Sequence, residues 1–329
     1  MSSHHTNPRS LLNPATRTLI DRVQRAGRPP MHAMTAEQAR AFYDIGGPIL
    51  DLQPAPHVDR VEDITVPARD GHAMPARLYA PQSATPLPVL LYLHGGGFLS
   101  CGPGTHRTIT ASLAKGLGVP VFALDYRQLP EVGVGTSVHD AFEAYRELLG
   151  QRGYRHVVVA GDSAGGYLTG KVAELASVND VPAPTALAML SPWLDLDIGD
   201  RDDRTSRHDA YLPIRQLAVV RPMLDRGPIP FAGAVSITDV SPEAFPPTIV
   251  ITAEQEMLEP DALEFAENLE AAGNRVVLHS YPWQIHAFTV MLRHREGAES
   301  VRLVVDFLNE AIREAHAGDS GDRPQSEAS

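Results

Sequence analysis

A serine at position 163 stands in a setting that could make it a nucleophile. The run Gly161-Asp162-Ser163-Ala164-Gly165 follows an apolar stretch over residues 156–160 and precedes a helical pattern that begins at Ala164. Glycines two residues before and after the serine leave room for a strained turn that lifts the hydroxyl out of the backbone. The pattern is typical of a nucleophile elbow for acyl transfer. The alternative is a glycine-rich turn from strand to helix that carries an incidental serine.

A glycine triplet upstream offers the second component of such a site. Gly95, Gly96 and Gly97 follow His94 at the end of the apolar run 88–93. A lone triplet of this kind is more often a plain loop, but without side chains its backbone N–H groups can approach a substrate oxygen closely. The helix that begins at Ala164 also presents N–H groups to negative charge. We therefore expect the N–H groups of Gly96, Gly97 and Ala164 to form an oxyanion hole.

Alternating strand-like and helix-like segments would position these residues. Half-buried strand patterns cover residues 58–68 and 74–80, and mainly apolar strand patterns cover residues 88–93, 120–127, 156–162, 186–192, 246–254 and 275–281. Helical patterns separate most of the later strands and close the chain before its polar end. This alternation predicts an α/β fold in which helices cover both faces of a parallel sheet.

Breaks in this rhythm suggest the domain organisation. Residues 1–50 contain helical patterns interrupted by prolines, and residues 195–242 combine charges, prolines and weak helical stretches. A segment as long as the second one, between two strands, is usually functional. We expect 1–50 and 195–242 to form a helical cap or lid over a core made of 51–194 and 243–317. The polar end, 318–329, is expected to be a disordered tail.

Five segments, in order, resemble the hormone-sensitive-lipase-like family of α/β-hydrolases, which are mostly bacterial esterases. They are "HGGG", "DYRQLPE", "GDSAGG", "SPWLDL" and the histidine segment near Pro282, although "DYRQLPE" and "PWQIHAF" depart from the family's usual wording. The resemblance implies an eight-stranded, mostly parallel sheet with a cap made from the N-terminal helices and an insertion after strand six. It also implies hydrolysis of esters with short to medium acyl chains, without a cofactor or a metal.

A serine hydroxyl needs a general base, which in this fold is a histidine late in the chain. His286 lies in a loop between the last strand pattern and the last helix pattern, where its side chain could reach the carboxyl ends of the strands. His279 is expected to be a partly buried structural residue within that strand, and His294 and His316 are expected to be helical and solvated. His208, in the predicted insertion, is an outside candidate. We therefore assign the role of base to His286.

The acid that would orient His286 has more than one candidate in the sequence. The resemblance implies an aspartate three residues beyond Ala253, and Glu256 occupies that position. The fold accepts either carboxylate, so Glu256 is the predicted acid. Asp261 is the rival, although it could simply favour the start of the next helix. Phe98 stands where the family often has tryptophan and is expected to line the substrate pocket.

Composition limits the partners. The formal net charge is −12, from 40 acidic and 28 basic residues, and no basic block occurs along the chain. Binding to nucleic acid or stable association with an anionic membrane is therefore not expected. A single cysteine, Cys101, excludes an intramolecular disulfide and favours a reducing compartment, so the expected location is the cytoplasm. The expected partner is a small ester, and a homodimer is possible.

Two other functions fit the same residues. An amidase or lactonase would use the same serine, histidine and carboxylate, because the acyl-transfer chemistry is shared. A ligand-binding protein that kept the fold and lost catalysis would usually lack one of the three, whereas Ser163, Glu256 and His286 are all present. A carboxylesterase is therefore the leading hypothesis.

Overall fold

The fold is built on one sheet of eight strands. The computed structural model describes residues 35–44, 55–82, 88–197, 220–290 and 295–321, together with the isolated positions 14, 17, 18 and 21. The sheet has the order β1-β2-β4-β3-β5-β6-β7-β8, in which β1, β2 and β4 pair antiparallel and the other neighbours pair parallel. The strands are β1 (Arg60–Pro67), β2 (Ala73–Ala80), β3 (Val89–Leu93), β4 (Val121–Leu124), β5 (Val157–Asp162), β6 (Ala186–Leu190), β7 (Thr248–Ala253) and β8 (Val276–Tyr281). The predicted eight-stranded, mostly parallel sheet is confirmed.

Burial explains why the central strands are apolar runs. Every residue of β3 to β7 is buried, as expected for parallel strands covered on both faces. The two edge strands differ from them, because β1 is mainly exposed and β8 is half-exposed. The sequence patterns in these segments therefore reflect the position of each strand in the sheet.

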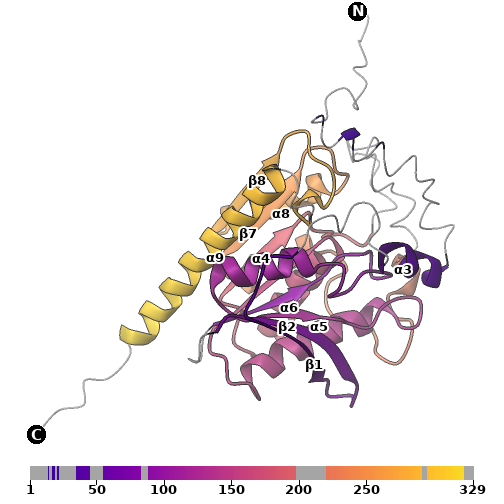
Figure 1. Cartoon of the computed structure of the whole chain (residues 1–329), viewed down its shortest axis with the longest axis horizontal. Coiled ribbons are helices and arrows are strands. Elements are labelled where there is room, and N and C mark those ends of the chain that lie inside the picture. The colour runs from indigo at the N-terminus through magenta and orange to yellow at the C-terminus, as the bar shows by residue number, and fades with distance from the viewer. Residues whose placement is uncertain are drawn as a thin grey trace, which may run out of the picture.

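Helices cover the two faces of the sheet (Figure 1). One face packs against α5 (Val134–Leu149), α6 (Ala164–Val178) and α8 (Glu259–Ala271), and the opposite face packs against α4 (Arg107–Leu117) and α9 (Arg295–Gly321). Each face has its own hydrophobic core, and the two cores are separated by the sheet. The predicted three-layer arrangement is thus present.

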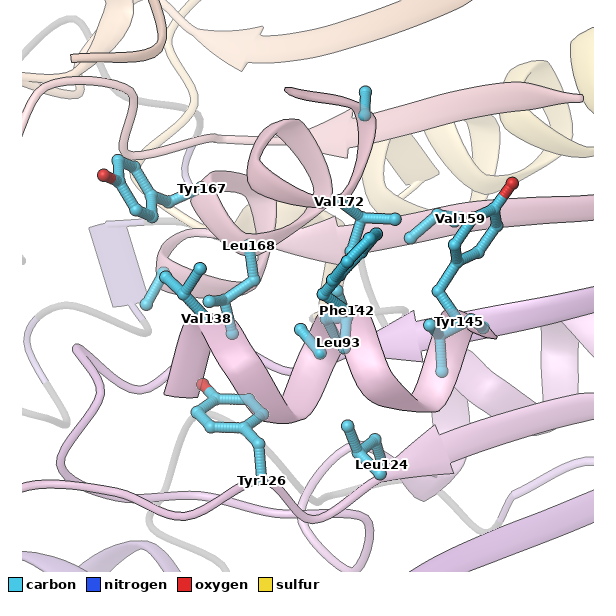
Figure 2. Close-up of a cluster of buried hydrophobic side chains, with 14 of the residues drawn as sticks. Leu93, Leu124, Tyr126, Val138, Phe142, Tyr145, Val159, Tyr167, Leu168 and Val172 are labelled. Carbon is cyan, nitrogen blue, oxygen red and sulfur yellow. The ribbon is translucent and has the colours of Figure 1, made fainter. Parts of the chain in front are cut away.

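Figure 2 shows how α5 and α6 are fixed to the sheet. Val138, Phe142 and Tyr145 of α5 recur at spacings of four and three residues, so they lie on one face of the helix. That face contacts a core that includes Leu93 of β3 and Val172 of α6. Burying a side chain of this size contributes about 1.5–3 kcal/mol. The packing holds α6, and with it the turn that carries Ser163, against the centre of the sheet.

The predicted cap is only partly within the described residues. Of the N-terminal region, α3 (Ala36–Asp44) is described, and it begins with a capping box in which Thr35 and Gln38 exchange side-chain-to-backbone hydrogen bonds of 2.9 and 3.1 Å. Of the predicted insertion, residues 198–219 lie outside the described residues. Residues 220–244 contain the short 3₁₀ helices η3 (Arg221–Met223), η4 (Ile237–Asp239) and η5 (Pro242–Ala244). The cap boundaries therefore stay a prediction.

The predicted tail begins too early. Helix α9 continues through Gly318 to Gly321, so residues 318–321 are helical, while 322–329 lie outside the described residues. Once a helix is nucleated, each further residue gains one backbone hydrogen bond while only its own backbone angles are fixed, and a glycine weakens a helix without ending it. The last turns of α9 extend past the sheet in Figure 1.

Candidate active site

Ser163 occupies a strained turn between β5 and α6. Its backbone angles are φ 53° and ψ −118°, a conformation that L residues rarely adopt. A Cβ built on Gly165 would lie 1.9 Å from the carbonyl oxygen of Leu93, and one built on Gly161 would lie 2.3 Å from that of Gly165. Only hydrogen fits at these two positions. The steric role predicted for the two glycines agrees with these distances.

Replacing Gly165 by alanine is expected to disrupt this turn. The new methyl group would meet the backbone of β3, which cannot move away as a flexible side chain could. We expect a loss of about 3 kcal/mol or more in the free energy of unfolding, the upper end of overpacking costs. Gly104→Ala is the matched control, because a Cβ there meets nothing within 4 Å. Denaturant unfolding curves of both variants check this, and equal stabilities would contradict the steric argument.

Three side chains from distant parts of the chain form one line of hydrogen bonds. His286 Nε2 lies 2.9 Å from Ser163 Oγ, and His286 Nδ1 lies 2.8 Å from Glu256 Oε2. All three side chains are buried, with exposed fractions of 6% for Ser163, 3% for His286 and 1% for Glu256. The imidazole therefore bridges a hydroxyl and a carboxylate in a water-poor environment, the arrangement that a serine nucleophile requires.

The carboxylate of Glu256 is held by a second set of contacts. Its Oε1 atom accepts a hydrogen bond from the backbone N–H of Ala253 at 3.0 Å and another from the hydroxyl of Thr252. These donors leave Oε2 to face His286. Thr252 was not predicted from the sequence, where it reads only as one more residue of an apolar strand. Its position four residues before the acid is the one signal that could have suggested it.

The rival carboxylate, Asp261, belongs to the helix that follows. Asp261 is buried in the first turn of α8, the helix-start position considered for it as an alternative. The geometry brings Glu256 against His286. Glu254, two residues before Glu256, instead accepts a hydrogen bond from the backbone N–H of Trp283 at 2.9 Å.

The two other late histidines that the structure describes are both exposed, away from this buried line. His279 is exposed on β8 and contacts the ring of Tyr281 in a tilted arrangement with centroids 4.3 Å apart, so it is less buried than expected. The cause is that β8 is the edge strand of the sheet, where residues on both sides meet solvent. His316 is exposed on α9, as expected. His208 and His294 lie outside the described residues.

The glycine loop after β3 is braced from behind by Asp162, the residue before the serine. The Asp162 carboxylate accepts hydrogen bonds from the N–H of Gly95 at 3.0 Å and from the hydroxyl of Tyr92 at 2.8 Å. His106 Nε2 lies 3.2 and 3.3 Å from its two oxygens. Burial would raise the pKa of Asp162, but the charge and hydrogen bond of His106 and the hydrogen bond of Tyr92 outweigh it and lower this pKa. Asp162 therefore stays ionised and ties the glycine loop to the serine turn.

His94 supports the same loop as a neutral residue. Its ring stacks on Tyr126 with centroids 4.3 Å apart, and its Nδ1 lies 2.7 Å from the carbonyl oxygen of Gly95. Burial lowers the pKa of His94 to about 3, so the ring is neutral. Because a carbonyl oxygen can only accept, Nδ1 carries the ring proton and donates a hydrogen bond to it. Within the loop, Gly96 and Gly97 both have positive φ, 119° and 63°. The loop thus depends on glycine conformations and on two polar supports, Asp162 and His94. The contact of His106 with Asp162 was not predicted from the sequence.

Phe98 differs from the prediction that it lines the pocket. Its side chain is 0% exposed, with its ring 5.9 Å from that of Tyr167 and 5.7 Å from that of Trp193. The backbone of Phe98 has φ 60°, which turns the side chain under the loop and into the core. Phe98 therefore anchors the glycine loop by packing.

Two classes of site are not seen in the part of the chain that the structure describes. These residues contain no group of three or more histidine, cysteine, aspartate or glutamate side chains that could hold a metal ion. Among the same residues, no helix combines the length and the apolar character needed to cross a bilayer.

Comparisons with known proteins agree with this architecture. Residues 90–290 match a family described as alpha/beta hydrolase fold. The chain is 31% identical to ethyl acetate hydrolase of Pseudomonas putida, over 89% of this chain and 96% of that protein. It is 33% identical to the carboxylesterase/phospholipase LipF of Mycobacterium tuberculosis, over 69% of this chain and 63% of that protein.

A solved esterase structure is also similar to this chain. The crystal structure of an esterase from the bacterial hormone-sensitive lipase family is 27% identical, with a TM-score of 0.78 over 91% of this chain and 99% of that chain. The chain belongs to the hormone-sensitive-lipase-like family of α/β-hydrolase esterases.

Proposed function

We propose that this carboxylesterase works through Ser163 as nucleophile, His286 as general base and Glu256 as the acid that orients the base. The observation that carries the proposal is the line of two hydrogen bonds, 2.9 Å from Ser163 to His286 and 2.8 Å from His286 to Glu256. Through the first bond the proton of Ser163 can move to Nε2 of His286, and the second bond keeps the other imidazole proton on Nδ1.

The first half of the reaction forms an acyl-enzyme. Ser163 Oγ attacks the ester carbonyl carbon while its proton moves to His286 Nε2. The carbonyl oxygen becomes an oxyanion, which the N–H groups of Gly96, Gly97 and Ala164 would bind. One such donor is worth about 3 kcal/mol in the transition state. The C–O bond to the alcohol then breaks, and His286 Nε2–H donates its proton to the leaving alkoxide.

The second half regenerates the enzyme. A water molecule takes the place of the alcohol and gives a proton to His286 Nε2 as its oxygen attacks the acyl carbon. The second tetrahedral intermediate uses the same three N–H groups. Its collapse breaks the bond to Ser163 Oγ, which regains its proton from His286, and the acid is released. Neither half requires a redox step or an additional reactant besides water.

The proposed substrates are esters with short to medium acyl chains. Ethyl acetate hydrolase, a relative that spans most of the chain, is named for an ester of acetic acid. Hydrolysis of p-nitrophenyl esters with two to sixteen acyl carbons tests the proposal, and we expect the largest kcat/KM at the short end. Absence of turnover on every ester would favour a ligand-binding protein. Faster turnover of a matched anilide or lactone would favour an amidase or a lactonase.

The cap stays part of the proposal, with boundaries 1–50 and 195–242 around a core of 51–194 and 243–317. Deletion of residues 1–45 removes α3 and is expected to lower kcat/KM more for octanoate than for acetate esters, because the cap would supply apolar pocket wall. Thermal unfolding serves as the control for the sheet. An unchanged acyl-length profile in the folded deletion variant would contradict the cap assignment.

We also propose that the protein forms a homodimer and is located in the cytoplasm. A homodimer is supported by β8, an edge strand on which Val277 and Leu278 are 41% and 36% exposed. An open strand edge with apolar side chains can pair with a second copy. Size-exclusion chromatography with light scattering tests this, because it gives the molar mass of the protein in solution. A cytoplasmic location is supported by the single buried cysteine and is tested by cell fractionation.

A further inference from the structure

Arg40 of α3 reaches the loop that carries the oxyanion-hole glycines. Its Nε donates to the carbonyl oxygen of Leu99 at 3.2 Å, and one Nη donates to the carbonyl oxygen of Leu129 at 2.7 Å. Both Nη atoms also donate to the carboxylate of Glu131, at 2.7 and 2.6 Å. One guanidinium therefore joins the N-terminal helix to two separate loops of the core.

The backbone segments that carry the carbonyls of Leu99 and Leu129 are hydrogen-bonded to each other. The N–H groups of Leu99 and Ser100 both donate to the carbonyl oxygen of Gly96, at 3.1 and 3.2 Å, and so fold the loop into a tight turn. The N–H of Leu129 donates to the carbonyl oxygen of Phe98 at 2.7 Å. Arg40 thus adds bonds on both sides of a turn that contains Gly96, the residue whose N–H is assigned to the oxyanion.

This turn has little tolerance for movement. A Cβ built on Gly96 would lie 2.0 Å from the carbonyl oxygen of Ser100, so the backbone is folded back on itself. The Leu99 carbonyl shares its peptide plane with the N–H of Ser100, which donates to the Gly96 carbonyl. The Gly96 carbonyl in turn shares its peptide plane with the N–H of Gly97, so a rotation of the peptide after Leu99 would reach the N–H of Gly97. Donors that bind a developing oxyanion must already point at it, because their advantage comes from paying no reorganisation cost during the reaction.

The ion pair with Glu131 serves mainly to orient the guanidinium. The side chains are 33% exposed for Arg40 and 59% for Glu131, and exposed pairs of this kind contribute little to stability. The hydrogen bond from Arg40 lowers the pKa of Glu131, so this carboxylate is ionised at neutral pH. A carboxylate held at two points fixes the plane of the guanidinium, which leaves Nε and the shared Nη aimed at the two carbonyls. Lysine cannot reproduce this fork.

We propose that Arg40 is a positioning residue for ester hydrolysis: it holds the turn at residues 96–100 so that the N–H groups of Gly96 and Gly97 face the oxyanion. This inference rests on the proposed function of those glycines. It makes the geometry of the oxyanion hole depend on docking of α3, a helix outside the α/β core. A substitution at Arg40 should then weaken binding of the transition state more than binding of the ester.

Kinetics of Arg40→Ala and Arg40→Lys with p-nitrophenyl acetate and butyrate test the proposal. We expect kcat to fall about 10- to 100-fold in both variants, the size of effect seen when a reacting group is misplaced by about 1 Å, with KM within about 3-fold of wild type. Added guanidinium ion at millimolar concentration should restore part of kcat in Arg40→Ala. Glu131→Gln, which keeps an acceptor oxygen, should lose less than either Arg40 variant.

A transition-state mimic gives a readout that a loosened helix would not change. An aryl trifluoromethyl ketone adds to a serine hydroxyl and places an oxyanion in the hole. Its inhibition constant should rise in Arg40→Ala by the same factor by which kcat/KM falls. Arg313→Ala is the matched control, because this arginine of α9 donates to a helix carbonyl, that of Asn309, far along the chain from the site. We expect wild-type kinetics in that control.

Several outcomes would overturn the proposal. An unchanged kcat in folded Arg40→Ala, or a rise in KM alone, would show that Arg40 only docks the helix. If Arg40→Ala is unfolded at the assay temperature, Arg40→Lys decides, since it keeps the charge and the aliphatic stem, and a wild-type kcat there would refute the role. Failure of the proposed function is distinguishable, because it would appear as ester turnover that survives Ser163→Ala in a chain that keeps Arg40.

Discussion

Ser163→Ala is expected to lower kcat for ester hydrolysis about 10⁴- to 10⁶-fold, while the protein stays folded. The substitution removes one hydroxyl from a turn whose geometry is set by its neighbours. The backbone N–H of Ser163 bonds to Leu190 and its carbonyl oxygen bonds to the N–H groups of Tyr167 and Trp193, and alanine keeps all of these bonds. Without the hydroxyl there is no atom to form the acyl-enzyme.

Initial rates on p-nitrophenyl butyrate, together with thermal unfolding, check this result. Ser112→Ala is the matched control, because Ser112 lies on α4 and bonds only to the carbonyl of Thr108 one turn away among the contacts described for it. A fluorophosphonate should add covalently to the wild-type enzyme and to Ser112→Ala, and mass spectrometry should find no adduct on Ser163→Ala. Normal turnover in folded Ser163→Ala would refute the mechanism.

Glu256→Gln is expected to lower kcat about 10⁴-fold, for a reason that can be read from its hydrogen bonds. Oε1 of Glu256 is an acceptor for the hydroxyl of Thr252 and the N–H of Ala253. In the glutamine variant the amide oxygen stays with these two donors, so the NH₂ group must face His286. A donor at Nδ1 forces the imidazole proton onto Nε2, where it points at Ser163 and blocks its deprotonation. The amide also cannot stabilise the imidazolium.

Two further variants separate this effect from general loss of charge. Glu254→Gln makes the same chemical change two residues away, and its amide oxygen can still accept the N–H of Trp283, so we expect kcat within about 3-fold of wild type. Asp261→Asn alters the first turn of α8 and should affect stability more than kcat. Single-turnover acylation rates of the three folded variants give the ranking. A larger loss in Asp261→Asn than in Glu256→Gln would transfer the role of acid to Asp261.

The identity of the acid illustrates what a sequence leaves open. Glu254, Glu256, Glu259 and Asp261 lie within eight residues, and each is a carboxylate near the end of a strand. The turn after β7 decides among them, because it directs Glu256 inward onto Thr252 and Ala253 and Glu254 outward to Trp283. Asp261 enters α8 instead. Side-chain direction in an irregular loop depends on local dihedral angles, which the pattern of residue types does not encode.

Phe98 and Arg40 show the same limit at longer range. Phe98 was expected in the pocket, but its positive φ turns the ring toward Tyr167 and Trp193. Arg40 reads in the sequence as one more charge on a helix, and its bonds to Leu99 and Leu129 arise only when segments about 60 and 90 residues apart are packed together. Contacts of this kind are made by the tertiary fold and have no local signature.

The sheet and the serine turn are recognisable from residue types and their order along the chain. The buried strands β3 to β7 are recognisable because parallel strands between two helical layers must be apolar on both faces. Gly161 and Gly165 are recognisable because only hydrogen fits where β3 passes the turn. The carboxylate that meets His286, the groups that brace the glycine loop and the helix that reaches this loop become visible only in the folded chain. Steric exclusion and burial restrict residue type position by position, whereas a hydrogen-bond partner is selected by distance and direction between segments that are remote in the chain.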